Sequence, residues 1–291
     1  MDFLSYLING LGLGSVYAII ALGYTMVYGI AKMLNFAHGD VIMIGAYVAF
    51  FSISDLGLPL IPAVLLSVAV CTLLGVLIER LAYKPLRSAS ALSVLITAIG
   101  VSYFLQNAAQ LLWSSSTKVF PGVIPSGGIT WNGLTVSWVT MITISVCLVV
   151  MTVLILFINY TKTGRAMRAC SEDKGAATLM GISVNRMISI TFAIGSGLAA
   201  FASVLLCATY PSVNPTLGAM PGIKAFTAAV FGGIGSIPGA FLGGLLLGVI
   251  EILARAYIST QLSDAIVFAV LILILLIKPT GLLGKKLREK V

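Results

Sequence analysis

The chain consists of long apolar runs separated by short polar breaks, and this pattern restricts the possible folds more than any other feature. A membrane-spanning helix needs about 20 mostly apolar residues. Hydrophobic residues make up 59% of the 291 residues and charged residues only 9%. In soluble domains the charged share is about 25%. The sequence therefore predicts an all-α polytopic membrane protein.

The apolar runs predict nine crossings of the bilayer, or eight if one of them is a broken element. The least regular run, 221–238, is glycine-rich and interrupted, which indicates a short, broken or re-entrant helix. The other expected spans are 4–30, 41–54, 60–78, 91–113, 139–158, 187–210, 239–258 and 265–277. The glycines spaced for close helix packing are Gly10, Gly12, Gly14, Gly235, Gly239, Gly243, Gly244 and Gly248. No linker divides the chain, so residues 1–291 are expected to form a single domain.

Lysine and arginine gather in a few short segments, as they do in the cytoplasmic loops of membrane proteins. By this rule loop 159–186 and the C-terminal tail are both cytoplasmic, so an even number of crossings separates them and 221–238 must supply one. Segment 114–138 then lies on the extracytoplasmic side, where Asn132-Gly133 between alternating residues predicts a β-hairpin. The basic residues concerned are Arg80, Lys84, Arg87, Lys162, Arg165, Arg168, Lys174, Arg186, Lys278, Lys285, Lys286, Arg288 and Lys290.

Several function classes find no support in the sequence. The net charge of +8 arises from these loops and not from a nucleic-acid-binding patch. The chain has no GxxxxGK[ST] phosphate-binding motif. It has a single histidine, His38, and no metal-ligand spacing among its cysteines. Glu251 and Arg255, four residues apart on one helix face, are expected to pair with each other. We therefore expect no catalytic residue, cofactor or metal in this chain.

The longest water-compatible stretch, 163–186, is expected to contain a short helix over 171–181. Ser171 suits the N-cap, and Glu172 and Asp173 suit the first turn, where the helix dipole favours negative charge. Gly181 suits the left-handed position that follows the last turn. A helix this short is marginal by itself, because nucleation is costly. It is a candidate docking element for a soluble partner, and the alternative is an ordinary solvated amphipathic loop.

A polar break at 32–40 separates the first two apolar helices. Its free backbone groups and the start of the next helix can offer a binding place to a zwitterionic substrate. The alternative is a connecting turn at the membrane surface, in which Asp40 merely caps the next helix. The candidate residues of a translocation path are Asn35, His38, Gly39 and Asp40.

Three motifs, in this order, resemble the permeases of branched-chain amino-acid ABC importers, and specifically the smaller, H-type permease. They are GLGLGSVYAIIALGYTMVYGIAKMLNFAHGD, GRAMRACSEDKGAATLMGI and KAFTAAVFGGIGSIPGAFLGGLLLG. The resemblance extends over residues 10–284. It implies ATP-driven import of leucine, isoleucine and valine, or of related hydrophobic amino acids, by a chain that is not itself an enzyme.

The resemblance also implies partners and a location. The partners are a second, homologous permease subunit, two cytoplasmic ATPase subunits that bind the ATP, and an extracytoplasmic amino-acid-binding protein. The location is the lipid bilayer of a bacterial inner membrane, crossed several times, with the C-terminus in the cytoplasm. Carried onto this chain, the family's ATPase-coupling motif falls on Gly164, Arg165, Arg168, Ala169, Glu172, Asp173, Ala176 and Gly181.

The main alternative is a secondary carrier or facilitator for a small hydrophobic solute. A carrier coupled to protons or sodium needs buried ionisable groups, which are costly in lipid and rare here. This class also leaves the loop at 163–186 unexplained. A structural scaffold is the third class, and the glycine-rich broken helices do not favour it.

Overall fold

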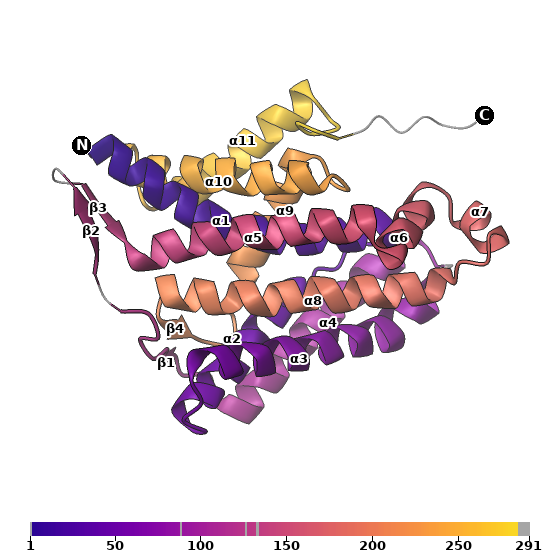
Figure 1. Ribbon diagram of the computed structural model, residues 1–291, viewed down its shortest axis with the longest axis horizontal. Helices are drawn as coiled ribbons and strands as arrows, with labels where there is room; N and C mark the ends of the chain where they lie inside the picture. Colours follow the sequence, from indigo (N-terminus) through magenta and orange to yellow (C-terminus); the bar gives the residue numbers. More distant parts are fainter. Residues whose placement is uncertain (1, 88, 126, 132–133, 285–291) are drawn as a thin grey trace.

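The computed structural model describes residues 2–87, 89–125, 127–131 and 134–284 (Figure 1). These residues are mostly helical, as expected. The helices are α1 (Asp2–Ala31), α2 (His38–Ser54), α3 (Leu60–Ile78), α4 (Ala91–Trp113), α5 (Trp138–Tyr160), α6 (Lys162–Glu172), α7 (Lys174–Leu179), α8 (Val184–Thr209), α9 (Ala219–Gly232), α10 (Ile237–Tyr257) and α11 (Ser263–Ile277). The shorter elements are η1 (Glu79–Tyr83), η2 (Lys84–Leu86), β1 (Lys118–Val119), β2 (Gly128–Trp131), β3 (Leu134–Ser137) and β4 (Ser212–Val213).

In the described part of the chain, six helices are long and apolar enough to cross a membrane. They are α1, α3 together with η1 and η2, α4, α5, α8 and α10. Helices α2 and α11 are also apolar but shorter. The chain is thus a polytopic helical membrane protein.

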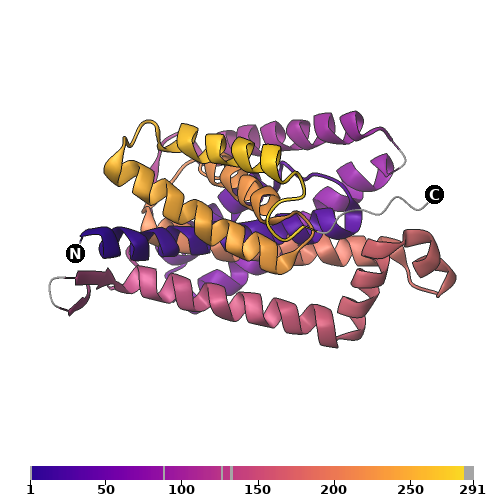
Figure 2. The same cartoon turned by 90° about the horizontal axis from the view of Figure 1, so that it is seen from above.

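Helix α1 forms the centre of the bundle. In its most apolar stretch 94% of the residues are buried, compared with 17% in α4 and in α5. It packs against α5, α8, α9 and α10, and the long helices run side by side around it (Figures 1 and 2). Helices α4 and α5 therefore present most of their surface outward, where a membrane protein meets lipid.

Close backbone contact at glycines joins α1 to α10. A Cβ atom on Gly14 would lie 2.7 Å from the Leu245 carbonyl oxygen, and one on Gly248 would overlap the backbone of Gly14. Gly244 faces Ala18 in the same way. Small residues allow two helix backbones to approach closely in lipid. The prediction of helix packing is confirmed for Gly10, Gly14, Gly244 and Gly248. It is wrong for Gly235, which lies in the turn before α10 with φ +94°.

The two ends of the chain repeat one order of elements in opposite directions. Helix α1 is followed by a non-helical break and the short helix α2, and α8 is followed by a break and the short helix α9. In this comparison α1 corresponds to α8, α2 to α9 and α3 to α10. Helix α1 packs on α10 and α8 packs on α3, while α2 packs on α3 and α9 packs on α10. Figure 1 shows that α1 and α8 run in opposite senses. This arrangement is typical of membrane transport proteins built from inverted repeats.

The segment 221–238 contains a helix boundary. Helix α9 ends at Gly232, a turn with positive φ at Gly233 and Gly235 follows, and α10 begins at Ile237. Pro221 and Pro238 each lie in the first turn of a helix, where the missing N–H removes no helical hydrogen bond. The expected short helix is present, but it ends before Pro238, and the next span begins at Ile237 instead of residue 239.

Strands β2 and β3 form the expected antiparallel hairpin, with Thr130 opposite Thr135. Its turn, 132–133, lies outside the described residues. Strands β1 and β4 also pair, with Lys118 opposite Val213, and this pair joins the hairpin segment to the chain after α8. Figure 1 shows the hairpin at one end of the molecule and α6 and α7 at the other.

We expect Gly248→Leu to destabilise the bundle by about 1–3 kcal/mol, because a side chain there must separate α10 from the backbone of α1. Gly100→Ala in α4 is the matched control, since a Cβ atom at that position meets nothing within 4 Å. Thermal unfolding in detergent micelles measures both. Equal midpoints for the two variants would contradict the proposed role of the α1–α10 glycines.

Candidate functional site

The segment 159–186 forms two helices separated by one extended residue. Thr161 caps α6, since its hydroxyl accepts a hydrogen bond from the Gly164 N–H at 2.9 Å. Asp173 has extended backbone angles and caps α7 through a 3.0 Å hydrogen bond from the Ala176 N–H. The prediction of one helix over 171–181 capped by Ser171 is therefore wrong. The Ser171 hydroxyl donates back to the Arg168 carbonyl at 2.7 Å, so Ser171 belongs to the last turn of α6.

The predicted end of the short helix at Gly181 is confirmed. Gly181 has φ +78°, the left-handed conformation that its position predicts. The Gly181 N–H donates to the Thr178 carbonyl at 2.9 Å, and the Ile182 N–H donates to the Ala177 carbonyl at 3.0 Å. This pair of bonds is the Schellman motif that ends many helices.

Two large apolar side chains of this segment are almost fully exposed in the described structure. Leu179 is 90% exposed and Met180 is 82% exposed, whereas Ala177 alone in α7 is buried. The two side chains thus extend the apolar surface of this segment outward from the rest of the chain. A short helix that presents such side chains at the end of the molecule offers a contact surface for another protein.

The residues assigned to the coupling motif divide into two groups. Gly164 is buried, and a Cβ atom on it would overlap the backbone of Phe157 and Ile158, so it serves the packing of α6 on α5. Ala169 is half-buried. The others lie exposed on α6, on α7 or in the turns that end them: Arg165, Arg168, Glu172, Asp173, Ala176 and Gly181.

The later part of the break, with Asn35, His38 and Asp40, lies inside the bundle, whereas Lys32 at its start is exposed. Asn35, His38 and Asp40 are at most 3% exposed. The Tyr83 hydroxyl donates to Asn35 Oδ1 at 2.9 Å. A Cβ atom on Gly39 would lie 2.6 Å from the Gly218 carbonyl oxygen, so the starts of α2 and α9 touch each other. These candidate residues are therefore enclosed by the protein and do not form an exposed turn.

Asp40 does not cap α2. The helix begins at His38 with Ala37 in the N-cap position, which places Asp40 in the third helical position. Its Oδ1 accepts a 2.9 Å hydrogen bond from the side-chain amide of Gln106 on α4. The expected cap failed because α4 supplies a donor that no local pattern reveals.

His38 is enclosed by α1. Its Nε2 lies so close to Gly23 that a Cβ atom there would be 2.6 Å away, and its ring contacts Tyr24 with centroids 4.5 Å apart. In the described structure Nε2 has no hydrogen-bond partner. Gly23 is thus the position on α1 that makes room for this imidazole.

A buried charge network links α9, α10, α1 and α11. Lys224 Nζ lies 2.7 Å from Glu251 Oε1 and 2.7 Å from Asp264 Oδ1. The Tyr17 hydroxyl donates to Glu251 Oε2 at 3.0 Å, and Arg255 pairs with Glu251 along one helix face. The expected Glu251–Arg255 pair is confirmed. Lys224 was missed, although a lone lysine within an apolar helix is the signal that reveals such a group.

A second buried carboxylate, Glu79, lies at the end of the molecule that carries α6 and α7. It is fully buried, pairs with Arg87, and accepts a 2.7 Å hydrogen bond from the Ser189 hydroxyl of α8. Arg87 also donates to the Asn185 side chain. These contacts fix the chain after α3 to the start of α8.

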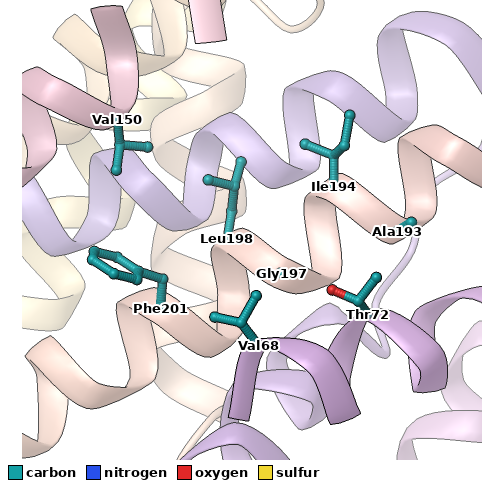
Figure 3. A pocket seen from close by; sticks show the side chains of 8 residues that line it. All are labelled: Val68, Thr72, Val150, Ala193, Ile194, Gly197, Leu198 and Phe201. Atoms are coloured by element: carbon teal, nitrogen blue, oxygen red, sulfur yellow. The ribbon is translucent and has the colours of Figure 1, made fainter. Parts of the chain in front are cut away.

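An open groove of about 370 Å³ lies between α3, α5 and α8. Figure 3 shows Val68 and Thr72 on one side and Leu198 and Phe201 on another, with Val150 across from them. Its lining is apolar except for the Thr72 hydroxyl, so it offers no charged group to the carboxylate or ammonium of an amino acid. In the described residues no group of three histidine, cysteine or acidic side chains is placed to hold a metal ion.

These features define a membrane-embedded transport subunit, with an apolar bundle, paired short helices that start inside it, and an exposed two-helix segment at one end. Residues 6–275 match the family described as "Branched-chain amino acid transport system / permease component". The chain belongs to this family. It is accordingly a transport permease and not an enzyme.

Several similar proteins carry names that describe branched-chain amino acid transport permeases. The chain is 49% identical to the high-affinity branched-chain amino acid transport system permease protein BraD of Pseudomonas aeruginosa, over 99% of this chain and 98% of that protein. It is 47% identical to the corresponding protein LivH of Escherichia coli K12 over the same shares. It is 28% identical to a probable branched-chain amino acid transport permease of Methanocaldococcus jannaschii, over 94% and 91%.

We expect Glu251→Leu to destabilise the protein by about 3 kcal/mol, because it leaves the buried Lys224 ammonium without its deepest carboxylate. Lys224→Met should cost less, because Glu251 keeps Arg255 and Tyr17 as partners. The unfolding midpoints of both variants in detergent test this order. A larger loss for Lys224→Met would show that the lysine, and not the glutamate, holds the network together.

Proposed function

We propose that this chain is the membrane-spanning permease subunit of an ATP-driven ABC importer for branched-chain or related hydrophobic amino acids. The observation that carries the proposal is the exposed α6–α7 segment at the end of a bundle whose family consists of branched-chain amino acid permeases. The bundle has no nucleotide-binding motif of its own, so the energy for transport comes from separate subunits.

The proposed topology has nine crossings in a single domain, 1–291. Helices α1, α3, α4, α5, α8, α10 and α11 each make one crossing. The short helices α2 and α9 make the other two crossings, each together with the non-helical segment that precedes it. The N-terminus and the loop 114–138 are then extracytoplasmic, whereas segment 159–186 and the C-terminus are cytoplasmic. The concentration of basic residues in segment 159–186 and after α11 supports this orientation.

The proposed assembly contains four kinds of subunit. A second, homologous permease lies beside this one in the bilayer, two cytoplasmic ATPase subunits bind the ATP, and an extracytoplasmic amino-acid-binding protein delivers the substrate. The hairpin end of the molecule, opposite α6 and α7, is the side from which delivery would come. No cofactor is assigned to this chain.

Helix α7 docks on an ATPase subunit in this proposal and transmits its movement to α5 and α8. The exposed Leu179 and Met180 supply apolar contact area, and the exposed Glu172 and Asp173 supply charge. The residues assigned to coupling are Gly164, Arg165, Arg168, Ala169, Glu172, Asp173, Ala176 and Gly181. The structure supports a packing role for Gly164 and exposed positions for the two acids.

We expect replacement of Glu172 and Asp173 by lysine to uncouple ATP hydrolysis from uptake in the reconstituted complex. Asp173→Asn separates the loss of charge from the loss of the helix cap, because asparagine also caps helices. Alanine at this position would in addition cost the helix about 1 kcal/mol. Uptake and hydrolysis are measured together in proteoliposomes. Unchanged transport by the double variant would contradict the docking role, and uptake by this chain alone without an ATPase would contradict the proposed function.

Asn35, His38, Gly39 and Asp40 are proposed to border the translocation path. They lie at the start of α2, whose helix dipole favours a negative group such as an amino acid carboxylate. They are enclosed in the conformation described, so substrate access requires α2 and α9 to separate at the Gly39–Gly218 contact. The unpartnered Nε2 of His38 is the group left free to meet a substrate.

We expect His38→Ala to lower the maximal uptake rate of the complex more than Asn35→Ala, because Asn35 is already held by Tyr83 and His38 Nε2 has no partner. Tyr83→Phe serves as control, since it removes the bond to Asn35 without changing the start of α2. Initial uptake rates at saturating binding protein measure the effect. Wild-type rates for both alanine variants would remove these residues from the path.

A further inference from the structure

Lys174 joins α7 directly to the end of α1. It is the first residue of α7, and its Nζ donates a 2.9 Å hydrogen bond to the carbonyl oxygen of Ala31, the last residue of α1. The last carbonyl groups of a helix have no partner within the helix, and they carry the negative end of its dipole. The Lys174 ammonium therefore caps α1 from a segment 143 residues further along the chain.

The environment of Lys174 makes this carbonyl its principal anchor. Among the described residues no carboxylate forms an ion pair with Lys174, and the cations of Lys32 and Arg87 are close enough to act on its ammonium. Burial, and then the charges of Lys32 and Arg87, lower the pKa of Lys174 from its ordinary value. The carbonyl dipole at the end of α1 is thus the favourable contact that holds the ammonium in a positively charged neighbourhood.

The residues that follow Ala31 lead directly into the break. Lys32 has φ +59°, a left-handed conformation that side chains other than glycine rarely adopt. Three residues later the Tyr83 hydroxyl holds Asn35. Helix α2 then starts at His38, and Gly39 touches Gly218 at the start of α9. The break is anchored at one end by α7 and further along by η1.

We propose that Lys174 is a positioning residue that carries the displacement of α7 to the α1–α2 break and so to the contact between α2 and α9. This inference rests on the proposed function, because it assumes that an ATPase subunit moves α7. The backbone connects α7 to its neighbours α6 and α8. The hydrogen bond from Lys174 connects it in addition to α1, the central helix of the bundle. Strained backbone next to a mobile contact is a common feature of switch regions, and Lys32 supplies it here.

The test uses the full complex with its ATPase subunits and binding protein in proteoliposomes. Lys174→Met keeps the length of the side chain and removes the ammonium, whereas Lys174→Arg keeps a cationic donor. Lys162→Met, at an exposed lysine of α6, is the matched control for loss of one positive charge. The readout is the amount of amino acid imported per ATP hydrolysed, together with co-purification of the ATPase subunits.

We expect Lys174→Met to lower import per ATP by about tenfold, which is the effect of losing one charge-assisted hydrogen bond on an equilibrium. The ATPase subunits should still co-purify, Lys174→Arg should restore most of the coupling, and Lys162→Met should match the wild type. If Lys174→Met imports as much per ATP as the wild type, the inference fails and the proposed function stands. If wild-type import does not depend on ATP, the proposed function itself fails.

A distance measurement separates transmission from simple capping. The four native cysteines are buried, so labels can be directed to cysteines introduced at the half-buried Met33, just after α1, and at the exposed Thr178 of α7. In the wild-type background we expect the distance between these labels to stay the same with and without trapped nucleotide, because α7 and the end of α1 move together. With Lys174→Met the distance should change with nucleotide. A nucleotide-dependent distance in the wild-type background, with transport still coupled, would overturn the inference.

Discussion

Close backbone contact between helices is the interaction on which this structure depends. Lipid is as apolar as the side chains of the bundle, so helices gain little by hiding leucine and must gain from packing and hydrogen bonds instead. The glycines of α1 and α10 provide that contact along the central helix, and Gly39 and Gly218 provide it where α2 and α9 begin. Because a glycine contact has no side chains to interlock, it permits two arrangements of the same helices more readily than a leucine seam does.

Two buried charge clusters stabilise the ends of the bundle in a different way. Lys224 would be costly in lipid alone, and Glu251, Asp264 and Tyr17 offset that cost by satisfying it and one another. Glu79 and Arg87 do the same at the end that carries α7. Their mutual pairing explains how ionisable groups occur here without a proton- or ion-driven mechanism. The Lys224–Glu251 pair also fixes α9 against α10. The contacts of Glu79 fix the chain after α3 against α8.

Helix α7 has six residues, and a helix this short is not stable by itself. It depends on the residues at its ends, Asp173 and Gly181. Elements of this kind have low local stability, and moving parts of proteins are drawn from them. The Lys174–Ala31 bond joins this short helix to the end of α1, the central helix of the bundle.

The sequence by itself determined the membrane class, most of the spans, the hairpin and the end of α7, because these depend on local patterns: apolar run length, an Asn-Gly pair, and a glycine where φ is positive. It did not determine which residue caps a helix when two candidates compete. Neither Ser171 nor Asp40 caps a helix: the Ser171 hydroxyl donates to the Arg168 carbonyl, and the Asp40 carboxylate accepts from Gln106. Nor did it show that Asn35, His38 and Asp40 are buried, or that Lys224, Glu251 and Asp264 meet. Those facts depend on which distant helices lie side by side, and tertiary packing alone decides that.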